Sequence, residues 1–151
     1  MSTSSHRKRR TPRRLVNPLD ILASRSTAPI EDNKALDLAL AYKGSLDGLT
    51  TEWATEEMWH TCTCALNIAQ LLCEIGICPE AAQVIMDGQN GLVRTREIAK
   101  NTGTWRLSKS NLFPVQCAFV KHDEQLAIAS RNQVKAALDE VISRVNQGRI
   151  V

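Results

Sequence analysis

Apolar residues recur at spacings of three and four along most of the chain, which is the pattern of helices that bury one face. The clearest case lies near the C-terminus. Ser130 and Gln133 predict a capping box at the start of a helix, and Gly148 is its expected end. The stripe between them consists of Val134, Ala137, Leu138, Val141, Ile142 and Val145. We expect another helix to cover this stripe, and the fold to depend on it.

A second strong helix is predicted from Thr55 to Gly76. The hydroxyl of Thr55 is a suitable N-cap, and the carboxylates of Glu56 and Glu57 favour the positive end of the helix dipole. Apolar side chains again recur at three- and four-residue spacing, at Trp59, Cys62, Leu66, Ala69 and Cys73, with Leu72 alongside. This helix is therefore expected to be the most buried.

Glycines set the expected limits of two further helices. One runs from about Glu31 to Lys43 and ends at Gly44. The other opens at Pro79 and extends to about Asn101, with Gly103 past its end. Gly88 and Gly91 weaken the middle of this second helix, so a turn, kink or break is expected there.

The remaining predicted helix begins at Ser108 or Ser110 and runs to about Ile128. Pro114 is expected at its start, where the missing N–H costs little if the helix begins near Leu112 or Phe113. Only 4% of the 151 residues are aromatic, although 43% are hydrophobic, and this mixture suits helix packing better than a β-sandwich. The sequence therefore predicts an all-α fold, a compact bundle of about five mainly antiparallel helices with an extended basic N-terminal arm.

Cysteines and apolar runs indicate the compartment. The longest apolar-rich stretch, Cys62–Cys78, contains Asn67, Gln70 and Glu74, so no membrane span is expected. The basic start of the chain is followed by no apolar signal-peptide region. Five cysteines, an odd number, argue against a disulfide framework and favour reduced, buried thiols. We expect a cytoplasmic protein.

The charged residues are unevenly distributed along the chain. Residues 1–14 hold six basic and no acidic residues, and the rest has 13 basic against 16 acidic residues, a net charge of −3. We divide the chain into a basic arm and linker, residues 1–30, and a helical bundle domain, residues 31–151. Within the linker, Leu19–Leu22 is expected to form a short helical turn.

The basic arm is the strongest functional feature. Its charged residues are Arg7, Lys8, Arg9, Arg10, Arg13 and Arg14. Such a run suits phosphate backbones of nucleic acid or a nucleoprotein complex, an acidic groove of a host protein, or an import receptor. The alternative is a solubilising terminus with no partner.

A second group of basic residues lies in the last part of the helix that opens at Pro79 and in the segment that leads into the next helix. Its members are Arg94, Arg96, Lys100, Arg106 and Lys109. Trp105 stands among them and could stack on a base, as could Trp53 and Trp59. We expect instead that Trp59 is core and that Trp105 packs its loop, because no second aromatic residue is near Trp105 in the sequence.

Candidate catalytic and metal sites are weak. His60, Cys62, Cys64, Cys73 and Cys78 lie close in the sequence, but Cys62 and Cys64 point about 200° apart on a helix, so buried thiols are expected rather than a zinc site. Cys117 and His122 lie five residues apart, so His122-Asp123-Glu124 is read as a solvated helix face rather than a Cys/His enzyme site. The segment Asp87–Gly91 lacks the Lys-Ser/Thr of a phosphate loop. We therefore expect no enzyme activity, no metal and no cofactor.

Two segments resemble a class of small uncharacterised helical proteins encoded by phages and plasmids of proteobacteria. They are Arg9–Pro18 (RRTPRRLVNP) and Gly103–Arg106 (GTWR), the latter leading into the helix with His122. The resemblance implies a mobile-element origin and an accessory or host-interaction role. Our interpretation is an accessory protein that binds nucleic acid or a nucleoprotein complex through its arm. The alternative is a protein-binding module, or an inhibitor of a host or defence complex, that uses a helix face.

Overall fold

The computed structural model describes residues 32–149, with side chains from residue 40 onward. The described part consists of five α-helices and one 3₁₀ turn. In chain order these are α2 (Asp32–Gly48), α3 (Glu56–Glu74), η1 (Pro79–Ala81), α4 (Ala82–Thr102), α5 (Lys109–Ile128) and α6 (Arg131–Asn146). The predicted all-α bundle of five helices is confirmed. The arm, its linker and the turn expected at Leu19–Leu22 lie outside the described residues.

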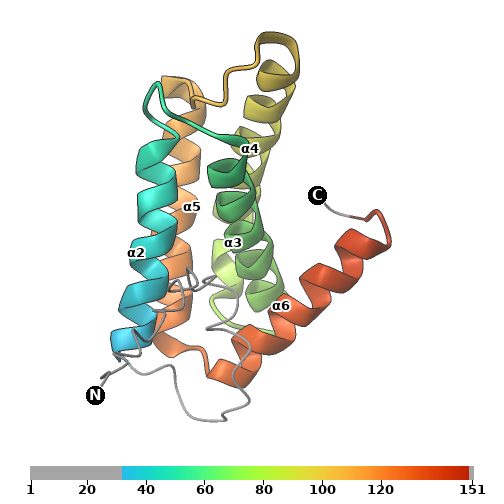
Figure 1. Ribbon diagram of the computed structural model, residues 1–151. Helices are drawn as coiled ribbons and strands as arrows, with labels where there is room; N and C mark the ends of the chain where they lie inside the picture. The colour runs from blue at the N-terminus through green and yellow to red at the C-terminus, as the bar shows by residue number, and fades with distance from the viewer. Residues whose placement is uncertain (1–31, 150–151) are drawn as a thin grey trace, which may run out of the picture.

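Helix α3 is the centre of the bundle. It packs against α2, α4, α5 and α6, and Figure 1 shows α2, α4 and α5 running alongside it. As predicted, the hydroxyl of Thr55 accepts a hydrogen bond from the backbone N–H of Met58, at 3.3 Å, and Glu56 and Glu57 occupy the first turn. Trp59, Leu66 and Leu72 are completely enclosed, which confirms α3 as the most buried helix.

Helix α4 is continuous, so the break expected at Gly88 and Gly91 is wrong. The glycines instead let α4 approach α5 closely. A Cβ on Gly88 would lie 2.4 Å from the Cβ of Ala118, and a Cβ on Gly91 would lie 3.0 Å from the backbone oxygen of Asn111. Tertiary packing between the two helices therefore outweighs the poor helix propensity of glycine.

Two other expectations are wrong: the end of the first helix at Gly44 and the place of Pro114 at a helix start. Helix α2 continues past Gly44 to Gly48, because Leu46 and Leu49 bury their side chains beyond the glycine. Helix α5 runs from Lys109 to Ile128, which agrees with the predicted limits, and Pro114 therefore lies in its second turn rather than at its start. Its missing N–H removes the usual partner of the Ser110 carbonyl, at an exposed position.

Helix α6 does not lie antiparallel to a neighbour along its length but crosses the end of α3 obliquely (Figure 1). The predicted capping box of Ser130 and Gln133 is present. The first part of the apolar stripe, including Leu138, is buried, whereas Ile142 is 49% exposed. Arg144 fixes the crossing by donating to both carboxylate oxygens of Glu74, at 2.8 and 3.2 Å. None of the described helices is long and apolar enough to cross a membrane.

Candidate nucleic-acid interface

The secondary basic residues lie along the C-terminal half of α4, in the connection to α5 and at the start of α5. Gly103, with a φ of +73°, ends α4 in a left-handed conformation that glycine adopts without strain. Five residues later, the hydroxyl of Ser108 caps α5 by accepting from the backbone N–H of Asn111. The sharp turn between the helices therefore gathers residues from both helices at one end of the bundle (Figure 1).

Aromatic packing and one backbone bond hold this connection. Trp105 lies against Trp59, with 5.6 Å between ring centroids, and the indole N–H of Trp59 donates to the carbonyl of Leu92 at 2.8 Å. The backbone N–H of Leu107 donates to the carbonyl of Leu49 at 2.8 Å. Trp59 is core and Trp105 packs its loop, as predicted, and Trp59 is the aromatic neighbour that Trp105 lacks in the sequence. Trp53 is 81% exposed and packs little.

We call the exposed cations here the basic end, formed by Arg94, Lys100, Arg106 and Lys109. Arg106 and Lys109 form no ion pair with any described residue, and Lys100 pairs only with Glu97, at 3.3 Å. Between residues 94 and 109, Glu97 is the only acidic side chain. The basic end therefore presents a largely uncompensated positive charge.

Two of the predicted basic residues already have partners. Arg94 donates from Nε to Asn111 Oδ1 at 2.9 Å, which leaves its terminal nitrogens available. Arg96 turns inward, with only 22% of its side chain exposed, and its guanidinium lies 5.6 Å from the centre of the Trp59 ring. Arg96 therefore stabilises the fold and does not belong to the basic end.

The connection between α2 and α3 lies at the same end of the bundle, next to the basic end. Residues 47–57, which we call the acidic loop, hold Asp47, Glu52, Glu56 and Glu57 and no basic residue. Within the described chain, no ion pair joins the acidic loop to the basic end. A polyanion approaching this end would be attracted by one half and repelled by the other, which fixes its orientation.

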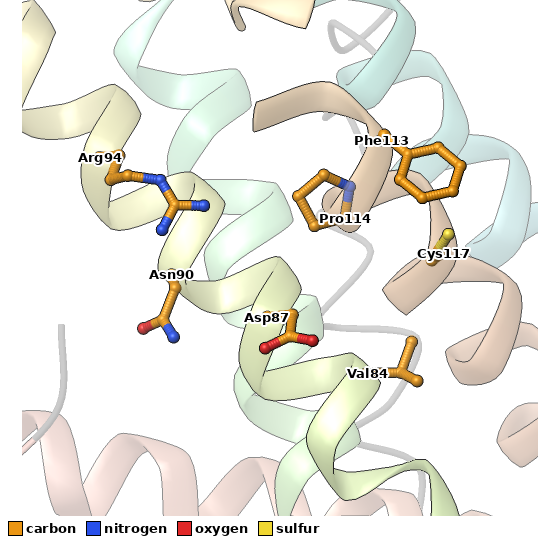
Figure 2. Close-up of a pocket in the computed structure, with 7 residues that line it drawn as sticks. All are labelled: Val84, Asp87, Asn90, Arg94, Phe113, Pro114 and Cys117. Atoms are coloured by element: carbon orange, nitrogen blue, oxygen red, sulfur yellow. The ribbon is translucent and has the colours of Figure 1, made fainter. Parts of the chain in front are cut away.

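A groove between α4 and α5 leads away from the basic end. It has a volume of about 450 Å³ and is shown in Figure 2. Its lining residues are Val84, Asp87, Asn90 and Arg94 from α4, and Phe113, Pro114 and Cys117 from α5. Phe113 is 71% exposed, and Asp87 Oδ1 accepts from Gln83 at 2.9 Å. The sequence interpretation missed this groove. The spacing of Gly88 and Gly91, which favours close helix packing, was the available signal.

His122 is completely buried, so the expectation that His122-Asp123-Glu124 forms a solvated face is wrong for its first member. Its Nδ1 lies 3.3 Å from Gln125 Oε1, and Gln125 donates to the carbonyls of Ala69 and Ile77 and to the Cys73 sulfur. Burial lowers the pKa of His122 to about 4, against weaker opposing effects of Gln125 and Asp123. His122 is therefore neutral at pH 7 and serves the core.

The cysteines are free thiols, with Cys62 and Cys73 buried and Cys64, Cys78 and Cys117 half-buried. Burial raises the pKa of Cys62 to about 12 and also raises the pKa of Cys64. Within the described residues, no group of three or more His, Cys, Asp or Glu side chains is arranged to hold a metal ion. The six arm residues, Arg7 to Arg14, lie outside the described part of the chain.

No protein-family model, curated protein or solved structure matches the chain.

Proposed function

We propose that this protein is a small accessory protein, of phage or plasmid type, that binds nucleic acid. In this proposal the basic end of the bundle and the basic N-terminal arm contact the phosphate backbone together. The observation that carries the proposal is the collection of Arg94, Lys100, Arg106 and Lys109 at one end, exposed and with a single acidic residue among them.

Counterion release supplies most of the expected affinity. Each phosphate that a Lys or Arg neutralises releases condensed cations, so the observed association constant falls steeply with salt. Six arm contacts to duplex DNA would give a log–log slope of about −5, and four further contacts from the basic end would bring it to about −9. Phosphate contacts carry no base information, so this part of the binding should be indifferent to sequence.

The test is a titration of the full chain with labelled duplex DNA at several salt concentrations. One variant neutralises the six arm residues to Gln, and a second does the same to the basic end. Lys109→Gln and Lys135→Gln form a matched single pair, because Lys135 lies on α6, away from the basic end. We expect Lys109→Gln to make the slope shallower by about 1 and Lys135→Gln to leave it unchanged. Equal slopes for all variants would refute the proposal.

A second candidate function is protein binding through a helix face. Phe113, Val120 and Ile128 are exposed on α5 by 71%, 57% and 67%. Phe113 and Val120 lie seven residues apart, so they share one face. A pull-down from host lysate with and without nuclease separates the candidates. Partners that nuclease removes indicate nucleic acid, and a partner that resists nuclease but is lost with Val120→Ser favours the helix face.

A further inference from the structure

The α4/α5 groove adjoins the basic end and holds polar groups that the fold leaves available. Arg94 belongs to both, and its terminal nitrogens are free because only Nε bonds Asn111. Asp87 uses one carboxylate oxygen for Gln83, so the other can accept a further hydrogen bond. Across the groove, α5 contributes Phe113 and Pro114 (Figure 2). The lining thus combines a cation, an acceptor and an exposed aromatic ring.

We propose that the groove takes one unstacked base of a single-stranded nucleic acid whose phosphates lie on the basic end. This inference rests on the proposed function and deepens it by naming the form of nucleic acid. Arg94 holds a phosphate, the base stacks on Phe113, and the edge of the base faces Asp87.

Stacking requires an accessible ring. Phe113 exposes 71% of its surface in the described structure, although it lies beside a groove that could partly cover it. Aromatic side chains next to cationic ones are the combination by which proteins hold single strands, because every base has a flat face that can stack. Bases in a duplex are already stacked and paired, so a groove between two helices admits an unpaired base and excludes the double helix.

Arg94 and Asp87 are separated along α4 by a distance that one ligand can span. Arg94 and Asp87 are seven residues apart, which corresponds to about 10 Å along a helix axis. Arg94 and Asp87 also share one face of α4, so they can engage the phosphate and the base of the same nucleotide.

Asp87 also predicts which bases are preferred. An ionised carboxylate accepts hydrogen bonds and donates none. Cytosine presents an amino group that donates to such an acceptor, whereas thymine and uracil present carbonyl oxygens in its place. We therefore expect the groove to favour a base with an amino group, and cytosine over thymine among the pyrimidines.

The experiment measures dissociation constants of the full chain for labelled oligo(dC), oligo(dT) and duplex DNA, by fluorescence anisotropy at fixed salt. Phe113→Ala should raise the dissociation constants for oligo(dC) and oligo(dT) about 10-fold and leave the constant for duplex DNA unchanged. Ile142→Ala is the control, because Ile142 is a half-exposed apolar side chain on α6 and does not line the groove. It should leave all three constants unchanged. Asp87→Ala should bring the ratio of the oligo(dC) and oligo(dT) constants close to 1.

The possible outcomes separate this inference from the proposed function. If Phe113→Ala binds single strands as tightly as the parent, while neutralising the basic end lowers the affinity for them, the groove inference is wrong and the proposed function stands. Equal parental affinity for oligo(dC) and oligo(dT) contradicts the role of Asp87. If the parent binds none of the three nucleic acids at low salt, both proposals fail. Far-UV circular dichroism of Phe113→Ala checks that the bundle remains folded.

Discussion

The close approach of α4 and α5 at Gly88 makes a quantitative prediction about stability. In an open helix, Gly→Ala stabilises by about 1 kcal/mol through helix propensity. At Gly88, however, the new Cβ would lie 2.4 Å from the Cβ of Ala118 and 3.1 Å from the backbone oxygen of Pro114. Neither atom can rotate away, so the helices must separate. Overpacking costs about 1–3 kcal/mol, and this site should lie near the upper value. Gly88→Ala should therefore lower the free energy of unfolding by about 2 kcal/mol.

Gly44→Ala is the matched control. Gly44 also lies inside a helix, but a Cβ there meets no atom within 4 Å. This variant should raise the free energy of unfolding by about 0.5–1 kcal/mol. Urea denaturation followed by far-UV circular dichroism measures both, with the dependence on urea unchanged if only stability is altered.

A double variant isolates the clash. Adding Ala118→Gly to Gly88→Ala removes the opposing Cβ, so the pair should be less destabilised than the sum of the two single changes. Gly88→Ala protein that is as stable as the parent would show that the helices do not meet closely at this point, and the groove that they form would lose its geometric basis.

Two further predictions concern buried groups. Since the pKa of His122 falls from 6.5 to about 4 on folding, the unfolded chain binds a proton that the folded chain does not, and the free energy of unfolding should fall by about 3 kcal/mol as pH drops from about 6.5 to about 4. Urea titrations across this range should show the loss in the parent and a smaller loss in His122→Gln; identical pH dependence would contradict the burial of His122. Leu138→Ala should cost about 2–5 kcal/mol, because Leu138 is 4% exposed. Ile142→Ala, at a half-exposed position, should cost under about 1 kcal/mol. Similar melting temperatures for the two variants would contradict the orientation of α6, which buries Leu138 and leaves Ile142 half-exposed.

Local signals account for what the sequence predicted well. The starts of α3 and α6 follow from Thr55 and from the Ser130–Gln133 box, because caps act within one turn of a helix. Gly103 as the end of α4 is of the same kind. The basic residues of the C-terminal half of α4 and of the start of α5 were likewise visible in the sequence, and four of the five are exposed in the structure.

The predictions that were wrong concern residues whose environment is determined by packing between helices. Gly88 and Gly91 favour a break when only propensity is considered, and continuity when α5 lies against them. The five-residue spacing of Cys117 and His122 argues against a Cys/His site, but it does not establish that His122 faces solvent. Its spacing from Phe119 and Leu126, three and four residues, placed it on the buried face of α5, and this periodicity was the better guide.

The groove is formed by side chains from two helices, and the sequence pattern of one helix does not determine how the other packs against it. Asp87 and Arg94 share a face of α4, but nothing in the local pattern places Phe113 across from them. A spacing rule finds one side of such a site and cannot find its partner.

The central claim is that nucleic acid covers the basic end, and lysine footprinting tests it most directly. The full chain is acetylated with and without a saturating single-stranded oligonucleotide, and modification of each lysine is measured by mass spectrometry. Lys109 and Lys100 are exposed at the basic end, whereas Lys135 lies on α6. We predict that the oligonucleotide protects Lys109 and Lys100 and leaves Lys135 unchanged. Equal modification of Lys109 with and without oligonucleotide, under conditions where binding is saturated, would contradict the account.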